Sequence, residues 1–398
     1  MGNWESVLLG TVCEVVRGGS PRPIIDYITD DSDGVNWLKI GDVKETDKFF
    51  THAAERIKPS GIPKTREVTV GDLILSNSMS FGRAFITLID GYIHDGWLRL
   101  RCDKDRLDKE YLYYFLTSSL AQNQFKAVAT GSVVNNLKSD TVKAVRIDLP
   151  PLKEQRKIAA VLAMIDDKIK CNEEINENLE QQAQAIFKSW FLDYDPWDGI
   201  VPDSWIDGKL GDFAAIKRGG SPRPIQEYLS DSGLRWLKIS DVTSIQTPFV
   251  IDIKDHIIEE GMKKTVFLKA GSLVLSNSAT PGVPKILDVD SCIHDGWLYF
   301  PESRFSKEYL YLYFKYIRQQ LVNLSNGSVF NNLKTDILKG YPTILPDEET
   351  LRSFDDLVNP MFLQMQNLTR ESHKLAAIRD AILPRLMSGE LDVSDLDL

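Results

Sequence analysis

Residues 150–191 read PPLKEQRKIAAVLAMIDDKIKCNEEINENLEQQAQAIFKSWF, and this stretch decides the architecture of the chain. Its apolar residues recur at alternating steps of four and three, the spacing of a helix that buries one narrow stripe. The stripe consists of Ile158, Leu162, Ile165, Ile169, Leu179, Ala183, Ile186 and Trp190, interrupted by Asn172 and Asn176. Prolines open the stretch and Asp195-Pro196 follows it, so we predict one helix of roughly 60 Å at ~1.5 Å per residue.

The C-terminal part of the chain repeats this spacing and offers a partner for the narrow stripe. The second stripe consists of Leu351, Phe354, Val358, Met361, Met365, Leu368, Leu375, Ile382 and Leu386. We therefore predict two helical spacers, 150–195 and 346–398, that alternate with two domains, 1–149 and 196–345. Asn172 and Asn176 are candidates for fixing the helix register, because a buried polar pair tolerates few alignments.

The two domains are copies of one unit. Arg17-Gly18-Gly19-Ser20-Pro21-Arg22-Pro23-Ile24 returns unchanged as residues 218–225. Further matches join 37–40 to 236–239, 75–78 to 275–278, 93–98 to 293–298, 109–113 to 307–311, and 135–138 to 331–334. Short apolar runs punctuated by Gly, Pro and Asn, with a helical segment near 112–120, predict mixed α and β structure. The predicted fold class is α+β, and the repeat indicates a duplication.

Composition places the chain among soluble globular proteins, with 43% hydrophobic and 26% charged residues. No apolar run is long enough to span a membrane, and the N-terminus lacks the features of a signal peptide. Cys13, Cys102, Cys171 and Cys292 lack the spacing of a zinc site and suit a reducing cytosol. We expect a cytoplasmic protein without a membrane partner.

The net charge of −10 is unevenly distributed. The two domains are almost neutral, and the predicted helical segments hold the excess of acidic residues. Affinity for DNA depends on local cationic surfaces rather than on the charge of the whole chain. The acidity therefore does not exclude a DNA-binding protein.

The repeated arginine loop is the first candidate binding site. Arg17, Ser20 and Arg22, with Arg218, Ser221 and Arg223, could bind phosphate or a guanine edge, and the glycines could let the backbone approach a phosphate. The alternative is a turn between strands that is shaped by its prolines. The loop lacks the P-loop pattern, so nucleotide hydrolysis gains no support.

Other repeated polar residues are further candidates for contacts with DNA. Asn can bind adenine and Lys can bind phosphate, although Ser and Asn equally cap turns. These candidates are Lys39, Ser76, Asn77, Ser78, Asn135, Asn136 and Lys138 in the first domain, and Lys238, Ser276, Asn277, Ser278, Asn331, Asn332 and Lys334 in the second.

No catalytic or metal site is predicted. His94-Asp95-Gly96-Trp97 could be read as a catalytic pair, but adjacent residues of an extended chain point to opposite sides, and no nucleophile accompanies them. A structural turn with a buried Trp explains this repeat better. Motifs of methyl transfer are also missing from the sequence.

The chain resembles the DNA-specificity subunit of type I restriction–modification enzymes. The resemblance rests on the order of domains and helices and on three motifs: Leu149-Pro150-Pro151-Leu152-x-Glu154-Gln155 with Ile165-Asp166-x-Lys168-Ile169, Phe187-x-x-Trp190-Phe191, and Leu383-Pro384-x-Leu386-x-Ser388-Gly389-Glu390-Leu391. The second spacer departs from the pattern, because Leu345-Pro346-Asp347-Glu348-Glu349 lacks the second proline and the Glu-Gln pair.

The resemblance implies a non-catalytic subunit with two target-recognition domains. It implies an antiparallel coiled coil of the two helices, with the domains related by an approximate twofold axis and facing inverted half-sites of a bipartite double-stranded DNA target. It also implies two methyltransferase subunits and endonuclease/translocase subunits as partners, which would use S-adenosylmethionine, ATP and Mg²⁺ while this chain binds no cofactor. Alternatives are a duplicated protein-interaction adaptor without a DNA role and, less consistent with the missing motifs, a free-standing enzyme.

Overall fold

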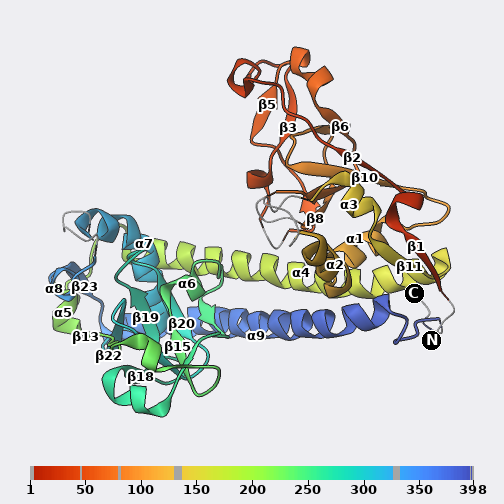
Figure 1. Ribbon diagram of the computed structural model, residues 1–398. Helices are drawn as coiled ribbons and strands as arrows, with labels where there is room; N and C mark the ends of the chain where they lie inside the picture. The colour runs from red at the N-terminus through yellow and green to blue at the C-terminus, as the bar shows by residue number, and fades with distance from the viewer. Residues whose placement is uncertain are drawn as a thin grey trace. The chain divides into compact units, whose positions relative to one another are not determined.

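A computed structural model describes residues 4–44, 47–78, 82–129, 137–325, 332–394 and 396. The chain forms two compact units, one of residues 1–167 with 375–398 and the other of residues 168–374. Each unit holds one β-rich domain and the adjoining parts of the two long helices, α4 (Leu152–Phe191) and α9 (Glu348–Met387) (Figure 1). None of the helices among the described residues has a stretch apolar enough to span a lipid bilayer.

The first domain contains two main sheets and one strand pair. The five-stranded sheet has the order β2-β10-β7-β8-β4, the four-stranded sheet has the order β5-β3-β9-β6, and β1 pairs with β11. The strands are β1 (Glu5–Leu8), β2 (Cys13–Arg17), β3 (Val35–Leu38), β4 (Phe49–Phe50), β5 (Glu55–Ile57), β6 (Arg66–Val68), β7 (Leu73–Ser76), β8 (Ala84–Thr87), β9 (Gly91–Ile93), β10 (Trp97–Cys102) and β11 (Arg146–Leu149). The helices are α1 (Lys109–Thr117), α2 (Ser119–Ala129) and α3 (Ser139–Lys143).

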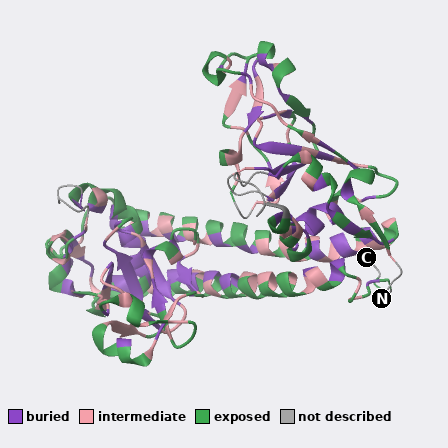
Figure 2. Cartoon of the chain, viewed as in Figure 1, coloured by how far each residue is buried: buried purple, intermediate pink, exposed green. Residues whose placement is uncertain are grey.

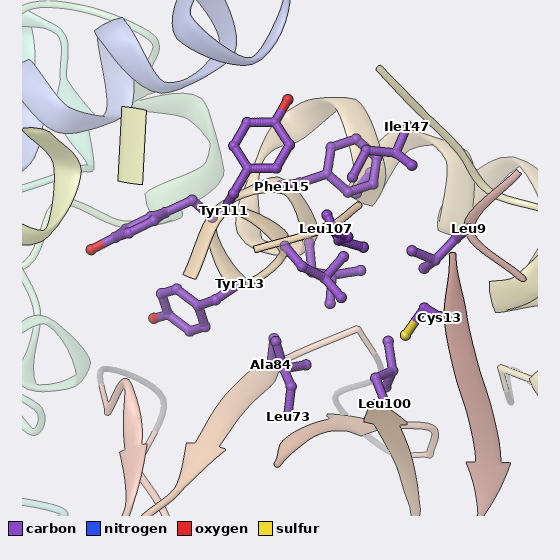
Figure 3. Packing of buried hydrophobic residues seen from close by; sticks show 14 of the residues in the cluster. Leu9, Cys13, Leu73, Ala84, Leu100, Leu107, Tyr111, Tyr113, Phe115 and Ile147 are labelled. Carbon is purple, nitrogen blue, oxygen red and sulfur yellow. The ribbon is translucent and has the colours of Figure 1, made fainter. Parts of the chain in front are cut away.

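The central strands of this domain are buried on both faces. Successive side chains of a strand point to opposite faces, so Leu73 and Leu75 of β7 enter one core while Ile74 enters another. The larger core lies between α1 and the sheet, with Tyr111 and Phe115 on the helix side and Leu73 and Leu100 on the strand side (Figure 3). Helix α1 begins directly after Asp108, which caps it because its carboxylate accepts hydrogen bonds from the backbone amides of residues 110 and 111, at 2.9 and 3.2 Å.

The second domain repeats this topology. Its sheets have the orders β13-β22-β19-β20-β16 and β14-β17-β15-β21-β18, and β12 pairs with β23. The strands are β12 (Ile206–Lys209), β13 (Ala214–Arg218), β14 (Leu229–Ser230), β15 (Leu234–Leu237), β16 (Phe249–Val250), β17 (His256–Ile257), β18 (Val266–Leu268), β19 (Leu273–Ser276), β20 (Pro284–Leu287), β21 (Ser291–Ile293), β22 (Trp297–Ser303) and β23 (Pro342–Leu345). The helices are α5 (Leu210–Phe213), α6 (Ile239–Val242), α7 (Lys307–Ser325) and α8 (Thr335–Lys339).

The two domains differ in one helical region. In the first domain α1 ends at Thr117, and α2 begins two residues later. In the second domain α7 is a single helix across the equivalent region. The duplicated mixed α/β domains predicted from the repeats are confirmed.

The two long helices pair in opposite directions within each unit. In the second unit Asn172 donates to the Ser372 hydroxyl at 3.3 Å, and Asn176 donates to that of Thr369 at 3.3 Å. As the numbers rise in α4 they fall in α9, so the predicted antiparallel pairing of the helices is confirmed. In the first unit Arg379 donates to Asp166 at 2.7 Å. Figure 2 shows exposed residues on most turns of both helices, as expected for a pair that buries a narrow stripe.

The predicted stripe is correct in the middle of α4 and wrong at its end. Asn172 is 0% exposed and Asn176 is 5% exposed, so both lie within the buried stripe. Near the C-terminus of α4, Phe187 and Phe191 are buried, whereas Ile186 and Trp190 are only partly buried. The buried side shifts by one residue because this end packs against the second domain as well as against α9. The role of the asparagines in fixing the register stays a prediction.

Candidate nucleic-acid interface

The arginine loop of each domain packs against the His-Asp-Gly-Trp turn. In the first domain the loop follows β2 and the turn connects β9 to β10. Strands β2 and β10 are paired, with Arg17 opposite Leu98, and the amide of Gly18 donates to the carbonyl of Trp97 at 2.9 Å. The sheet therefore brings together two motifs that lie almost 80 residues apart in the sequence.

The Asp95 carboxylate is the centre of this contact. The Ser20 hydroxyl donates to Asp95 Oδ1 at 2.7 Å, and Arg22 Nη2 donates to Oδ2 at 3.3 Å. Arg17 Nε donates to the backbone carbonyl of Asp95 at 3.0 Å. Two arginines and a serine thus meet at one aspartate, which none of the sequence patterns predicted.

The second domain repeats the same arrangement around Asp295. The Ser221 hydroxyl donates to Asp295 Oδ1 at 2.7 Å, and Arg223 Nη2 donates to Oδ2 at 3.4 Å. Arg218 donates to the backbone carbonyl of Asp295, and its Nη2 lies 3.6 Å from Oδ2. We call the two sites the Asp95 cluster (Arg17, Ser20, Arg22, Asp95) and the Asp295 cluster (Arg218, Ser221, Arg223, Asp295).

The neighbouring serine and arginine side chains keep the carboxylates of Asp95 and Asp295 ionised. The hydrogen bond from Ser20 lowers the pKa of Asp95, and the positive charge of Arg17 lowers it further. Burial by itself would raise the pKa of Asp295, but the hydrogen bond from Ser221 and the nearby arginines outweigh it, so the net shift is also downward. Each carboxylate is therefore a fixed negative charge that holds arginine side chains at neutral pH.

The guanidinium groups of Arg22 and Arg223 face solvent. Their side chains are 80% and 79% exposed, while Asp95 and Asp295 are each 37% exposed. A guanidinium carries several N–H donors, and the contact with the carboxylate uses one nitrogen of each. The outward-facing donors have the chemistry that binds phosphate or the O6 and N7 acceptors of guanine.

The glycines of the loop serve packing. A Cβ atom on Gly18 would lie 2.1 Å from the carbonyl oxygen of His94, and one on Gly19 would lie 2.4 Å from that of Lys64. Gly219 is equally close to His294, at 2.2 Å. The interpretation that these glycines let the backbone approach a phosphate is therefore wrong at Gly18, Gly19 and Gly219, because their amides already donate to the carbonyls of Trp97, Ile93 and Trp297.

The Ser-Asn-Ser triplets are mostly buried. Ser76 and Asn77 are 1% and 2% exposed, and Ser276 and Asn277 are 0% and 3% exposed. The Asn77 amide donates to the carbonyl of Asp95 at 2.9 Å, and the Asn277 amide donates to that of Asp295 at 3.2 Å. The asparagines thus support the turns that carry the two aspartates, and the serine hydroxyls accept from the amides of Arg83 and Val283, both at 3.0 Å or less. The prediction that these four side chains contact DNA is wrong, because they are buried.

The remaining candidates lie in several environments. Ser78 and Ser278 are half-buried, and Lys138 and Lys334 are exposed at the starts of α3 and α8. Lys39 pairs with Glu55 and Lys238 pairs with Asp255. Asn332 is half-buried, whereas Asn135, Asn136 and Asn331 lie outside the described residues.

The His-Asp-Gly-Trp repeat forms a structural turn, as predicted. Trp97 is fully buried, and its indole donates to the carbonyl of Leu38 at 3.2 Å. His94 Nδ1 accepts a hydrogen bond from the Gly96 amide at 2.7 Å, and burial lowers the pKa of His94, which keeps the ring neutral. Across the described ranges, no group of three or more His, Cys, Asp and Glu side chains could hold a metal ion.

Sequence reasoning missed the role of Asp95 and Asp295, although a signal was present. Each aspartate recurs beside a repeated histidine, and each arginine loop carries unbalanced positive charge. A repeated acidic residue in one motif and repeated arginines in another indicate a contact between the motifs. The sequence could not show that the β2–β10 pairing supplies the required geometry.

Two family motifs have local explanations in the structure. Gln155 is 1% exposed; its amide accepts from the Asp108 backbone at 2.8 Å and donates to the carbonyls of Arg106 and Pro150 at 2.9 and 2.8 Å. In the second spacer Asp347 accepts from the Ser204 hydroxyl and from the amide of Thr350, both at 2.8 Å. At 345–349, where the sequence departs from the pattern, the hydrogen bonds of a partly exposed Asp347 therefore replace those of a buried Gln155.

Comparison with known proteins identifies the family. The family described as "Type I restriction modification DNA specificity domain" matches residues 1–181 and 202–359. The MjaIX specificity subunit of a type I restriction enzyme from Methanocaldococcus jannaschii is 24% identical over 99% of this chain and 95% of its own length. The HindI specificity subunit from Haemophilus influenzae is 23% identical over 98% of this chain and 100% of its own.

A solved structure has the same fold. The S subunit of a type I restriction–modification system from M. genitalium superposes with a TM-score of 0.59 at 15% identity, over 96% of both chains. The duplicated domains, the paired long helices and the two family matches together favour the DNA-binding interpretation over the adaptor. The chain belongs to the type I restriction–modification DNA specificity family, and it is a non-catalytic specificity subunit of such a system.

Proposed function

We propose that each recognition domain reads one half of a bipartite double-stranded DNA target with the surface that carries Arg22 or Arg223. The observation that carries the proposal is that both side chains are about four-fifths exposed while an ionised aspartate holds each guanidinium. An arginine that is held in place loses less conformational freedom on binding than a mobile one. The exposed lysines Lys138 and Lys334 are candidate phosphate contacts of the same domains.

The half-sites are proposed to be related as inverted sequences. The two clusters have the same residues and the same contacts to within 0.1 Å for the serine and outer arginine bonds. Equal loops on equal folds are expected to recognise similar base pairs. Methylome sequencing of cells that carry the system tests this relation, because two unrelated half-sites would contradict it.

The partners follow from the family. We propose two methyltransferase subunits and endonuclease/translocase subunits as partners, with S-adenosylmethionine, ATP and Mg²⁺ bound by those subunits. Residues 151–200 and 346–398, which include the two long helices, hold the excess of acidic residues and are proposed as the main docking surface. The proposed location is the cytoplasm.

Arginine substitutions test the DNA contacts. Arg22→Ala and Arg223→Ala, measured with a methyltransferase partner present, are each expected to weaken binding by about 1–3 kcal/mol if the side chains read guanine. Arg22→Lys separates base reading from phosphate binding, since lysine keeps the charge but loses the bidentate geometry.

The control is Arg304→Ala, which removes an exposed arginine of the second domain outside both clusters. DNA binding is measured at several salt concentrations. If both cluster variants bind as tightly as the unsubstituted protein, the arginines only shape a turn. A loss of affinity in Arg304→Ala equal to that in Arg223→Ala would indicate a general charge effect.

A further inference from the structure

The second domain contains a cationic cavity. The cavity has a volume of about 240 Å³ and lies between α6, β20 and α7. Its polar lining includes Lys285, Lys315 and Arg318, with Thr243, Gln246 and Thr280. Three basic side chains, two hydroxyls and an amide form a set of hydrogen-bond donors suited to an anion.

Lys285 is the most unusual member of this set. It is 4% exposed, and its ammonium group donates to the backbone carbonyls of Ile245, at 2.8 Å, and Thr247. Burial lowers the pKa of Lys285 to about 8. Buried charges normally need a charged partner, and the described contacts of this ammonium group are to neutral carbonyl oxygens.

One carboxylate reduces the positive charge at the cavity without cancelling it. Glu180 of α4 lies 2.9 Å from Lys315 Nζ and accepts a hydrogen bond from the Tyr311 hydroxyl at 2.8 Å. With Lys285 and Arg318 protonated, the four ionisable groups still leave a net positive charge. Arg318 is exposed at the mouth, where its Cγ would lie 3.3 Å from a Cβ on Gly282.

The first domain provides an internal comparison. The strand registers match Lys285 to Phe85, because Val274 pairs with Lys285 as Ile74 pairs with Phe85. The helix repeat matches Lys315 to Thr117. Arg318 corresponds to Gln122, because the two face the equivalent glycines Gly282 and Gly82.

The first domain has two basic residues near the equivalent place, Arg83, which is the counterpart of Val283 and lies over the ring of Phe85, and Lys48, which is paired with a carboxylate. Lys48 lies over the ring of Tyr113, the counterpart of Tyr311, at 5.2 Å from its centroid. Its ammonium group lies 2.6 Å from Glu110. In the second domain Pro248 occupies the position of Lys48, since the carbonyls of both residues accept from equivalent amides of β8 and β20.

We infer that this cavity binds a phosphate group through Lys285, Lys315 and Arg318. The volume is below the ~300–1,000 Å³ of typical small-molecule pockets, which favours a small anion over a whole nucleotide. A backbone phosphate of bound DNA and free inorganic phosphate share this chemistry. The DNA source rests on the proposed function.

The test replaces the three basic residues of the cavity by their counterparts in the first domain. The triple variant Lys285→Phe, Lys315→Thr, Arg318→Gln is compared with a control that removes three exposed lysines of the same unit, Lys254→Gln, Lys339→Gln and Lys374→Gln. If the triple variant folds poorly, Arg318→Gln and Lys315→Thr alone are used, because they leave the contacts of Lys285 in place.

The first arm measures binding of inorganic phosphate to the full chain by isothermal titration calorimetry at constant ionic strength, with chloride as the reference anion. We expect phosphate binding by the unsubstituted protein and by the lysine control, and a loss of at least tenfold in the triple variant. The second arm measures DNA affinity with the methyltransferase partner at several salt concentrations. The logarithm of the binding constant falls linearly with the logarithm of the salt concentration. Removing a contact with one backbone phosphate should make this slope less steep by about 0.9.

The outcomes separate the two sources and the two proposals. If the dependence of DNA affinity on salt is less steep in the triple variant, but not in the control, the cavity is assigned to a DNA phosphate. Loss of phosphate binding with an unchanged slope assigns it to free phosphate. If the variant matches the control in both arms, the inference is overturned. If the unsubstituted protein binds phosphate but no DNA, the proposed function fails while the cavity assignment stands.

Discussion

Replacing Asp166 by alanine is expected to loosen the first recognition domain from the helices. Asp166 belongs to the Ile-Asp-x-Lys motif of α4, and its carboxylate accepts from the Tyr114 hydroxyl of α1 and from Arg379 of α9, both at 2.7 Å. The Asp166 side chain is 19% exposed, and that of Arg379 is 31% exposed. One carboxylate therefore connects three helices of the same compact unit.

The size of the effect follows from what remains after the carboxylate is removed. A hydrogen bond to a charged group contributes about 1.5–3 kcal/mol, and breaking a fully buried ion pair costs about 3–5 kcal/mol. Here the loss is smaller, because the Tyr114 hydroxyl still accepts from Lys48 at 3.2 Å and Arg379 still contacts Asp380. We expect Asp166→Ala to lower the free energy of unfolding of this unit by about 2–3 kcal/mol.

Hydrogen exchange with mass spectrometry can measure this change locally. The most protected amides of α1 should exchange roughly 30- to 150-fold faster, since every 1.4 kcal/mol corresponds to a factor of ten. The control is Asp167→Ala, which removes the exposed acidic residue next in the sequence. Equal exchange rates in the two variants would refute the reasoning, and Tyr114→Phe should give an intermediate rate.

Three further predictions concern positions with distinct physical roles. Gly18→Ala is expected to destabilise the first domain by more than about 2 kcal/mol, because its Cβ would lie 2.1 Å from a carbonyl oxygen; thermal unfolding measures it, and an unchanged midpoint would contradict the packing role. Asn176→Leu is expected to raise the free energy of unfolding by roughly 1 kcal/mol, because it replaces a buried amide by an apolar side chain. If this residue fixes the helix register, methylome sequencing of the variant should reveal targets with more than one spacer length. The pKa of His94 is lowered by burial in the native state, so the unfolded chain is protonated first and stability should be complete above about pH 6.5 and decrease on acidification. In His94→Gln this part of the pH dependence should be smaller, and an identical profile would argue against a neutral buried ring.

The sequence predicted those features that depend on local patterns. The stripe of α4 located a helix at 150–191, and the structure has it at Leu152–Phe191. The duplicated motifs predicted two equivalent domains, and the buried Trp97 was expected from its turn. Periodicity and repetition are properties of neighbouring residues, so a single sequence is enough to show them.

Features that depend on long-range pairing could not be predicted in this way. Asn77 was a candidate for a contact with a base, but the sheet order buries it behind the Asp95 turn. Phe187 replaces Ile186 in the buried stripe because the second domain covers that side of α4. The cavity beside Lys285 requires the alignment of β20 with α7, and nothing in the local sequence indicates that contact.

The pairing of the first and last strands of each domain has a consequence for evolution. β1 runs antiparallel to β11, with Glu5 opposite Leu149, and β12 runs antiparallel to β23, with Ile206 opposite Leu345. The chain therefore enters and leaves each domain at adjacent points, which is the geometry that tolerates domain insertion. Genetic recombination at two short junctions could exchange a whole recognition domain, while the long helices keep their pairing.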